Sequence, residues 1–194
     1  MPITNGYATL AEVKSALRIN DSVDDTRLES AIQRASRWID SKTGRFFYQV
    51  SGTYDFVCQN PYRIRIVDLA TANGLVVTSD DNNDNSFSGT WELNTDFRLE
   101  PTEAPAFGLP YNFLYAQDSE WVQDTRVRVQ GTFGFPAIPD PIKEACTLLS
   151  IRLYKRPDAP LGVAGFGDMG AVMVRGVDSD AQALLQPFIR IAVA

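Results

Sequence analysis

The sequence predicts an α+β fold in which the N- and C-terminal parts form a small α-helical bundle with an inserted antiparallel β-sheet or small barrel. Apolar residues recur at helical spacing between Ser22 and Thr43, and again between Asp140 and Arg156. Between Phe46 and Phe133 the pattern changes to short alternating segments separated by turn residues. We therefore expect residues 1–46 and 134–194 to form a helical core and residues 47–133 to form a β-rich insertion.

The N-terminal part is expected to contain two helices. Thr9 and Glu12 have the spacing of a capping box at the start of a short helix. Ser22 and Asp25 fit a second capping box, which would open a longer helix that ends at Gly44 in a left-handed C-cap. Two helices joined by so short a loop usually pack together as an αα-hairpin.

Several segments of the central region have the alternation and composition of strands. They are residues 53–57, 63–67, 75–78, 90–93, 97–99 and 126–129. The proline-rich stretch 103–120 is expected to be an ordered connection, and the alternation of Tyr111, Phe113 and Tyr115 leaves a further strand open within it.

A second long helix is expected from Asp140, as its N-cap, with Pro141 in the first turn and Pro157 ending it. Its main apolar face comprises Ile142, Ala145, Cys146, Leu149 and Leu153, and a second face comprises Leu148, Ile151 and Tyr154. A helix with two apolar faces is expected to be buried on two sides, against the earlier helix and against another surface. A neighbouring subunit is a candidate for that second surface.

The composition excludes several classes of protein. With no histidine in the chain, the usual catalytic triads and most zinc sites are ruled out, and no distinctive pair of acids is visible. The formal charge of -6 argues against a dedicated nucleic-acid binder. Cys58 and Cys146 are too few for a disulfide framework, and Cys146 is expected to be a buried thiol. We expect a protein that is no enzyme and has no cofactor, metal or membrane segment.

Two motifs resemble ligand sites, and in each a structural explanation is favoured. Residues 165–170 match the dinucleotide pattern G-x-G-x-x-G, but they follow a helix rather than a strand, so a flexible loop is expected. Asp81, Asn83, Asn85 and Glu92 imitate the ligand spacing of a calcium loop. A serine replaces the glycine of that loop, so a solvated hairpin tip is expected.

The aromatic residues of the β region provide an alternative function. A sugar-binding face would make the chain a carbohydrate-binding module, and it would be lined by Tyr54, Phe56, Trp91, Tyr111 and Tyr115. Sheets use the same residue types to fill their cores, so core positions are expected for these side chains.

The C-terminal part combines a glycine-rich loop, residues 161–176, with an apolar tail, residues 187–194. The loop is expected to become ordered on assembly. The tail either docks on its own domain or adds to a partner by strand addition. The candidate assembly segment comprises Phe166, Met169, Val172, Phe188, Ile189, Ile191 and Val193.

Two stretches of the chain together resemble the head-tail connector, or adaptor, proteins of tailed bacteriophages. The first comprises Tyr7 to Leu17, the helix that begins with Asp24-Asp25, and Gly44-Arg45-Phe46-Phe47. The second comprises Val127 to Ala145, Arg156-Pro157, the glycine-rich loop and Ala183 to Phe188. The order resembles the family's sequence of strand, aromatic-glycine turn, proline-initiated helix and leucine-proline-aromatic segment.

This resemblance implies a structural virion protein that forms a ring, usually of twelve subunits, below the portal at the virion neck. DNA would pass through the central channel without sequence-specific binding, and a stopper or tail-completion protein would bind below. The C-terminal assembly segment would engage the portal protein. The long β insertion departs from the shorter family members. Synthesis and assembly would take place in the host bacterial cytoplasm.

Overall fold

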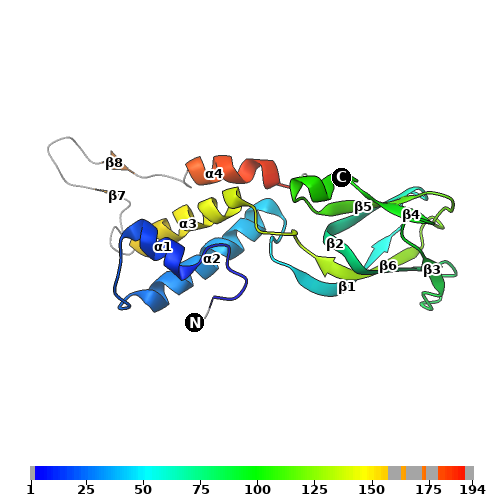
Figure 1. Cartoon of the computed structure of the whole chain (residues 1–194), viewed down its shortest axis with the longest axis horizontal. Helices are drawn as coiled ribbons and strands as arrows, with labels where there is room; N and C mark the ends of the chain where they lie inside the picture. The colour runs from blue at the N-terminus through cyan, green and yellow to red at the C-terminus, as the bar shows by residue number, and fades with distance from the viewer. Residues whose placement is uncertain (1–2, 157–162, 165–171, 174–178, 191–194) are drawn as a thin grey trace. The chain divides into compact units, whose positions relative to one another are not determined.

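The computed structural model describes residues 3–156, 163–164, 172–173 and 179–190 (Figure 1). The chain divides into two compact units. One consists of Met1–Arg45 with Ile138–Ala194, and the other consists of Phe46–Ala137. The first unit contains the long helices and the second contains a six-stranded antiparallel sheet, so the α+β class predicted from the sequence is confirmed.

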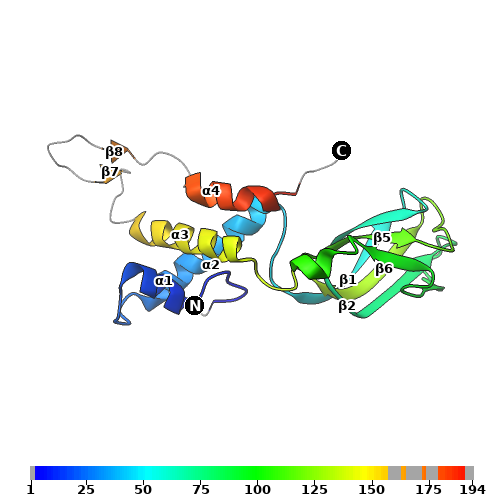
Figure 2. The same ribbon diagram turned by 45° about the horizontal axis from the view of Figure 1, so that its top comes forward.

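The helical unit is built on α3 (Asp140–Lys155), which contacts α1 (Leu10–Leu17), α2 (Asp25–Thr43) and α4 (Ser179–Leu185). In both Figure 1 and Figure 2, α4 lies alongside α3. The core of the helical unit is apolar, because the helices bury the periodic residues that the sequence pattern identified. The core includes Tyr7, Val13, Leu28, Ala31, Ile32, Ala35, Ile39, Ile142, Ala145, Cys146, Leu149, Ala181 and Leu185.

The helix ends confirm some of the expected caps and correct others. The capping box of α1 is present: the Glu12 amide donates to the Thr9 hydroxyl at 3.2 Å, and the Thr9 amide donates to the Glu12 carboxylate at 2.6 Å. Gly44 forms the left-handed C-cap of α2 with φ +65°. The N-cap of α3 is Pro139, so the prediction that Asp140 is the N-cap was wrong by one residue.

The capping box predicted for α2 was also wrong. The N-cap is Asp24 rather than Ser22, and its side chain makes no capping hydrogen bond. The Asp24 carboxylate instead accepts a hydrogen bond from the Tyr154 hydroxyl at 2.6 Å. The Asp25 carboxylate, which the box would have used, accepts one from Lys14 at 2.6 Å. Tertiary partners on α3 and α1 therefore take both carboxylates away from the helix end.

The sheet of the second unit has the order β1-β6-β2-β5-β4, and β3 pairs with β2. Its strands are β1 (Val50–Val57), β2 (Arg63–Asp80), β3 (Gly89–Trp91), β4 (Phe97–Glu100), β5 (Tyr111–Ala116) and β6 (Arg126–Phe133). The further strand left open in the proline-rich stretch is β5, which follows the short 3-10 helix η1 (Ala104–Phe107). The separate strands predicted at 63–67 and 75–78 are two parts of β2.

β2 is one continuous strand that pairs with different neighbours along its length. Its first part pairs with β5, and its second part pairs with β6 and β3. Register shifts between Leu69 and Val76 mark the change. Ile64 and Ile66 of the first part and Val77 of the second belong to one buried apolar cluster. The open sheet therefore folds over a single core.

Candidate assembly surfaces

The structure describes only part of the candidate assembly segment. Phe188 lies in the 3-10 helix η3 (Gln186–Phe188), and it and Ile189 are half-buried. The next residue is held on the helical unit, because the Arg190 amide donates to the Thr43 carbonyl at 2.8 Å. The beginning of the tail thus docks at the C-terminal end of α2.

Of the other five candidate residues, the structure describes only one. Val172 lies in β8 (Val172–Met173), which pairs with β7 (Val163–Ala164). Phe166, Met169, Ile191 and Val193 lie outside the described residues, as does the G-x-G-x-x-G motif. The role of the segment in assembly therefore stays a prediction.

The second side of α3 has a partner within its own unit. Helix α4 packs against α3 within the helical unit. Tyr154 near the end of α3 faces α2: the Arg27 guanidinium lies 4.7 Å from the centre of its ring and donates to its carbonyl at 2.8 Å. Tyr154, one residue of the second apolar face, therefore has partners within its own chain. A neighbouring subunit stays a candidate for covering Leu148 and Ile151, which are half-buried.

A polar cluster fixes the segment before α1 on α2. The Tyr7 hydroxyl donates a hydrogen bond to Asp40, and the Arg37 guanidinium lies 3.1 Å from the same carboxylate. Partial burial raises the pKa of Asp40 above its usual value, and the Tyr7 hydrogen bond opposes that shift. Arg37 also donates to the Asn5 carbonyl at 2.8 Å. The cluster serves to position the chain rather than to react.

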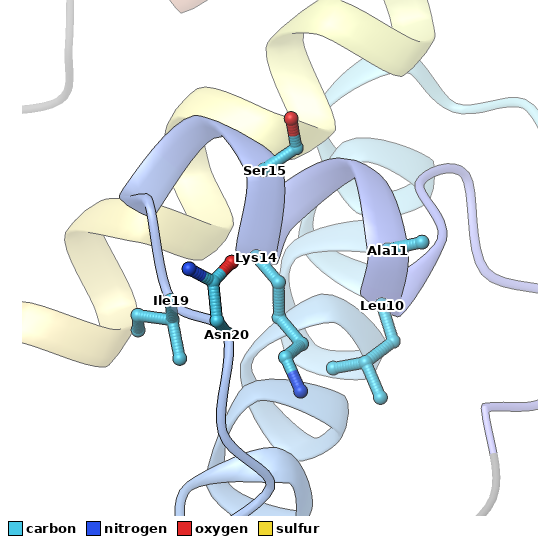
Figure 3. A pocket seen from close by; sticks show the side chains of 6 residues that line it. All are labelled: Leu10, Ala11, Lys14, Ser15, Ile19 and Asn20. Carbon is cyan, nitrogen blue, oxygen red and sulfur yellow. The ribbon is translucent and has the colours of Figure 1, made fainter.

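An open hollow of about 530 Å³ lies beside α1. In Figure 3 the side chains of Leu10 and Lys14 extend to the same side of α1, and Ile19 and Asn20 lie on the segment that follows. The ammonium of Lys14 is already bound by Asp25 at 2.6 Å. The lining of this hollow presents no pair of acid and base groups for catalysis.

One face of the sheet combines arginines with aromatic rings. Strand register aligns Arg98, Tyr115 and Arg63 in one row across β4, β5 and β2, and Glu100, Phe113 and Arg65 in the next. We call these six residues the arginine–aromatic face. The residues that alternate with them along the strands, Leu99, Leu114 and Ile64, are buried in the core on the opposite side.

The arginines of this face lie on the rings. The Arg63 guanidinium is 3.6 Å from the centre of the Phe113 ring, and the Arg98 guanidinium is 4.1 Å from that of Tyr115. The Glu100 carboxylate lies 3.1 Å from Arg98 and 3.9 Å from Arg63. Both arginine side chains keep much of their surface open, 48% for Arg63 and 40% for Arg98.

The loops at one end of the sheet are acidic. Residues 81–96 and 117–125 contain no lysine or arginine, and we call them the acidic loops. Their acidic residues are Asp81, Asp84, Glu92, Asp96, Asp118, Glu120 and Asp124. The loops meet: Trp91 stacks on Trp121 at 4.5 Å, the Gln117 amide donates to the Asp96 carbonyl at 2.8 Å, and Asp81, Asp96 and Ser119 line one small hollow.

The hairpin loop that imitates a calcium site is organised by protein groups. The fully buried carboxylate of Asp80 accepts hydrogen bonds from the amides of Asp84 and Asn85, and from Arg126 at 2.8 Å. Arg126 also donates to the Asn85 side chain. Among the described residues, no group of three or more His, Cys, Asp or Glu is placed to hold a metal ion.

The aromatic residues considered for sugar binding are dispersed. Phe56, Trp91 and Tyr111 pack against the sheet core, and Tyr54 lies edge-on to the buried Phe133 at 4.6 Å. Tyr115 stacks with Arg98. The described aromatic side chains therefore do not form a shared sugar-binding platform. The interpretation that they are core residues fits most of them.

Both cysteines are buried and free, and burial raises the pKa of the Cys146 thiol. No helix among the described residues is long and apolar enough to span a membrane. Among the described surfaces, the arginine–aromatic face and the acidic loops have the most distinct chemistry.

Residues 7–88 match the sequence model of a family described as Phage gp6-like head-tail connector protein. The match includes the first of the two stretches that resemble this family, and it continues through β1 and β2 into the following loop. The family resemblance inferred from the sequence is thereby confirmed. A search of curated proteins finds no match.

Three solved structures contain chains with this fold, and each match covers 100% of this chain. The neck of an empty gene transfer agent particle computed with C6 symmetry matches with a TM-score of 0.61, 16% identity and 95% of that chain covered. The neck of the native particle computed with C12 symmetry gives 0.59, 17% and 94%. The virion of the native particle gives 0.58, 17% and 95%. The fold is thus one found in the necks of phage-like particles.

Proposed function

We propose that this chain is a structural virion protein that acts as a head-tail adaptor. It forms a ring below the portal, DNA passes through the ring, and the stopper or tail assembles onto it. The observation that carries this proposal is the match of residues 7–88 to the head-tail connector family. The likeness of the whole chain to neck chains of gene transfer agent particles supports it.

The two compact units would have different roles. The helical unit, residues 1–45 with 138–194, would be the connector core, and the sheet would be an insertion into it. The helical unit also holds the start of the tail through the Thr43 carbonyl. Such an arrangement keeps the tail attached to a rigid element while its end is available to the portal.

A ring of twelve subunits is the proposed assembly. Its support is that one related neck structure was computed with C12 symmetry and another with C6, which is a subgroup of twelvefold symmetry. A ring requires heterologous contacts, in which two different patches of each subunit meet.

The distribution of charge fits a channel that DNA crosses without being held. Residues 46–137 contain 12 acidic and 5 basic residues, a formal charge of −7, whereas the rest of the chain has 12 acidic and 13 basic residues, a charge of +1. Sequence-independent grip on DNA requires basic groups that displace phosphate counterions. The acidic sheet unit in particular would repel the phosphate backbone of DNA rather than bind it.

The proposal is tested by producing particles without this chain. Heads that contain the portal protein should form, but tails should not attach, and supplying the chain in trans should restore tailed particles. Electron microscopy counts the two kinds of particle. Normal tail attachment in the absence of the chain would contradict the proposed function.

The role of the tail is tested by removing residues 191–194 only. This truncation keeps the hydrogen bond between the Arg190 amide and the Thr43 carbonyl, so the protein should melt at the same temperature but fail to join heads. Val23→Ser is a matched control, because Val23 is 87% exposed and lies outside the candidate segment. Incorporation of the truncated chain at the control level would rule out docking through the tail end.

A further inference from the structure

We propose that the β7–β8 hairpin of one subunit adds to the unpaired side of β1 in the next copy of this chain. This proposal rests on the proposed ring and names a contact within it. The hairpin and the strand are present in every copy, so each subunit can give one such contact and receive one.

β1 is an edge strand with one side unpaired. It stands at the end of the sheet order and is bonded only to β6 among the described strands. The Cys58 amide donates to the carbonyl of Thr125, opposite it, at 2.9 Å, so every second residue of β1 counted from Cys58 faces β6. The residues in between turn their backbone amides and carbonyls to the unpaired side, which we call the open edge. They are Ser51, Thr53, Asp55 and Val57.

The open edge lacks the features that usually prevent another strand from adding to a sheet. β1 contains no lysine, arginine or proline, and its register with β6 is continuous over all 8 residues, without a bulge. Its single charged residue, Asp55, is held by Arg128 of β6 through two hydrogen bonds. The edge can therefore accept a strand without rearrangement.

The other edges of the sheet are covered or short. At β4, the Asn94 amide donates to the Phe97 carbonyl at 2.7 Å, and the Phe97 amide donates to the Glu92 carbonyl at 3.4 Å. The chain's own preceding turn therefore covers the start of the outer side of β4. β3 has only 3 residues. Among the described strands, β1 thus offers the longest open edge.

An added strand would also cover apolar side chains. Val50, Tyr54 and Phe56 point to the core side of the sheet, because most of their partners in β6 are buried apolar residues. Val50 stays 36% exposed and Tyr54 39% exposed, since β1 is the last strand on this side of the described sheet. A strand with apolar residues at alternate positions would extend the core over them.

The β7–β8 hairpin has the properties of such a strand. β7 and β8 pair over two residues each, and the described residues give this ladder no third strand. A two-stranded ladder is at best marginally stable in water by itself. The sequence of β8 continues with strand-forming residues, because positions 171–174 read Ala-Val-Met-Val and carry no charge. The hairpin therefore gains stability from pairing with a further strand.

The path of the chain favours the edge of another copy over the subunit's own edge. The sheet unit joins the helical unit between Ala137 and Ile138, just before α3, whereas the hairpin follows the other end of that helix. The 16 residues of α3 separate these two points by about 24 Å. Pairing between copies does not require the hairpin to return along its own helix.

Mixed single-cysteine chains test whether the contact lies between copies. Particles are assembled from Thr53→Cys and Val172→Cys chains together and treated with a flexible bis-maleimide, which tolerates small differences in register. Cys58 and Cys146 are buried and should not react. A covalent dimer of the two variants is expected. The control replaces Thr53→Cys by Leu109→Cys, which is 42% exposed and precedes β5, and it should give no dimer.

A chain that carries both Thr53→Cys and Val172→Cys tests the ring arrangement. Cross-linking should give a ladder of products that continues beyond the dimer, because each subunit is joined to two neighbours. Products that stop at the dimer would show that two copies exchange hairpins as a two-fold pair. A cross-link within single chains only would show that the hairpin pairs with its own sheet. Either result contradicts the proposal.

Blocking the open edge provides a second test. Thr53→Pro removes an amide of the open edge and leaves the ladder with β6 intact, since proline is tolerated on the outer side of an edge strand. It should lower incorporation of the chain into particles about tenfold, because a hydrogen bond to the added strand is lost. Thr53→Ala keeps the amide and should be incorporated like the unmodified chain. Thermal melting shows that both variants are folded, and equal incorporation of the two would contradict the proposal.

The outcomes separate this contact from the proposed function. If the unmodified chain is absent from particles, the adaptor function itself is wrong, and this contact is wrong with it. If the chain is present but the mixed variants give no more dimer than the Leu109→Cys control, the adaptor function stands and the contact is wrong. A specific dimer together with a ladder beyond the dimer establishes the contact.

Discussion

Asp80 is the residue on which the hairpin loop between β2 and β3 depends. Its side chain is fully buried at the end of β2, where it accepts hydrogen bonds from Arg126 and from two loop amides. The Arg126 and Arg128 guanidiniums both lie against the Phe87 ring, the second at 3.6 Å. One carboxylate therefore fixes a loop that sequence pattern alone marks only as a turn.

Replacing Asp80 by alanine should lower the free energy of unfolding by about 3 kcal/mol, because the change removes one member of a buried ion pair and leaves two amides without their acceptor. Urea denaturation followed by circular dichroism measures the change. The control is Asp81→Ala, an exposed neighbour, for which the effect should stay within about 0.5 kcal/mol. Equal losses in the two variants would contradict the role given to Asp80.

A second carboxylate, Asp55, makes the stability of the sheet unit depend on pH. Arg128 donates two hydrogen bonds to it at 2.7 and 2.8 Å, and these bonds lower the pKa of Asp55 below its usual value. The unfolded chain therefore binds this proton more tightly than the folded one. The stabilisation is present above the unfolded pKa of about 3.9 and is lost as the pH falls through the lower folded value.

The variant Asp55→Asn should have a lower unfolding midpoint than the unmodified chain at pH 7, and the gap should narrow as the pH falls below about 4. Urea midpoints measured from pH 2 to pH 7 provide the comparison. Thr53→Ala, at an exposed position of the same strand, should give a gap that does not change with pH. A gap for Asp55→Asn that is constant down to pH 2 would show that the ion pair is not its cause.

At the scale of elements, local and distant interactions explain which helix ends could be predicted. The capping box of α1 was predicted correctly because Thr9 and Glu12 need only each other. The box of α2 was not, because Tyr154 and Lys14, which are distant in sequence or on another helix, bind the two carboxylates. Helix existence follows from apolar period, whereas the first residue of a helix depends on tertiary partners.

Removing the N-cap of α1 should cause a modest loss of stability. Thr9→Ala should reduce the free energy of unfolding by about 1 kcal/mol, because the amide of Glu12 loses its acceptor. Thr9→Ser keeps the hydroxyl and should be close to the unmodified chain. Thermal or urea unfolding distinguishes them. If serine and alanine destabilise equally, the hydroxyl does not act as a cap.

The turn after β6 requires a glycine at position 134. Gly134 has φ +106°, its amide donates to the Asp68 carbonyl at 2.7 Å, and an added Cβ would lie 2.0 Å from the Tyr48 carbonyl oxygen. The sequence shows a glycine between two phenylalanines, but the clash depends on the approach of a segment more than eighty residues away. Local pattern could not reveal it.

Gly134→Ala should destabilise the protein by more than about 2 kcal/mol, because both the backbone conformation and the space exclude a side chain. Gly108→Ala is the matched control. Gly108 also has a positive φ, +64°, but an added Cβ would meet nothing within 4 Å, so only the conformational cost of about 1 kcal/mol applies. Similar losses at the two sites would show that the close approach to Tyr48 is unimportant.

At the scale of the whole molecule, the division into helical and β-rich parts could be predicted because the apolar period changes near Phe46 and again after Phe133. The arginine–aromatic face could not, because Arg63, Arg98 and Tyr115 become neighbours only through the pairing of three strands. The candidate assembly segment was predicted from its apolar pattern, and the structure adds that the start of the tail is held at the end of α2.

The charge of the whole chain also has a different meaning once the units are known. The net charge of -6 is not spread evenly, because the sheet unit holds the entire excess of acidic residues. Within that unit the arginines gather on particular faces.

The central claim is that this chain forms a ring at the head-tail junction. Cryo-electron microscopy of purified particles, with the neck reconstructed without imposed symmetry, tests it most directly. We predict a closed ring below the portal whose subunits fit the helical and sheet units of this chain, with one copy in each of twelve positions. A neck reconstruction in which no density fits these units, from particles that contain the chain, would contradict the claim.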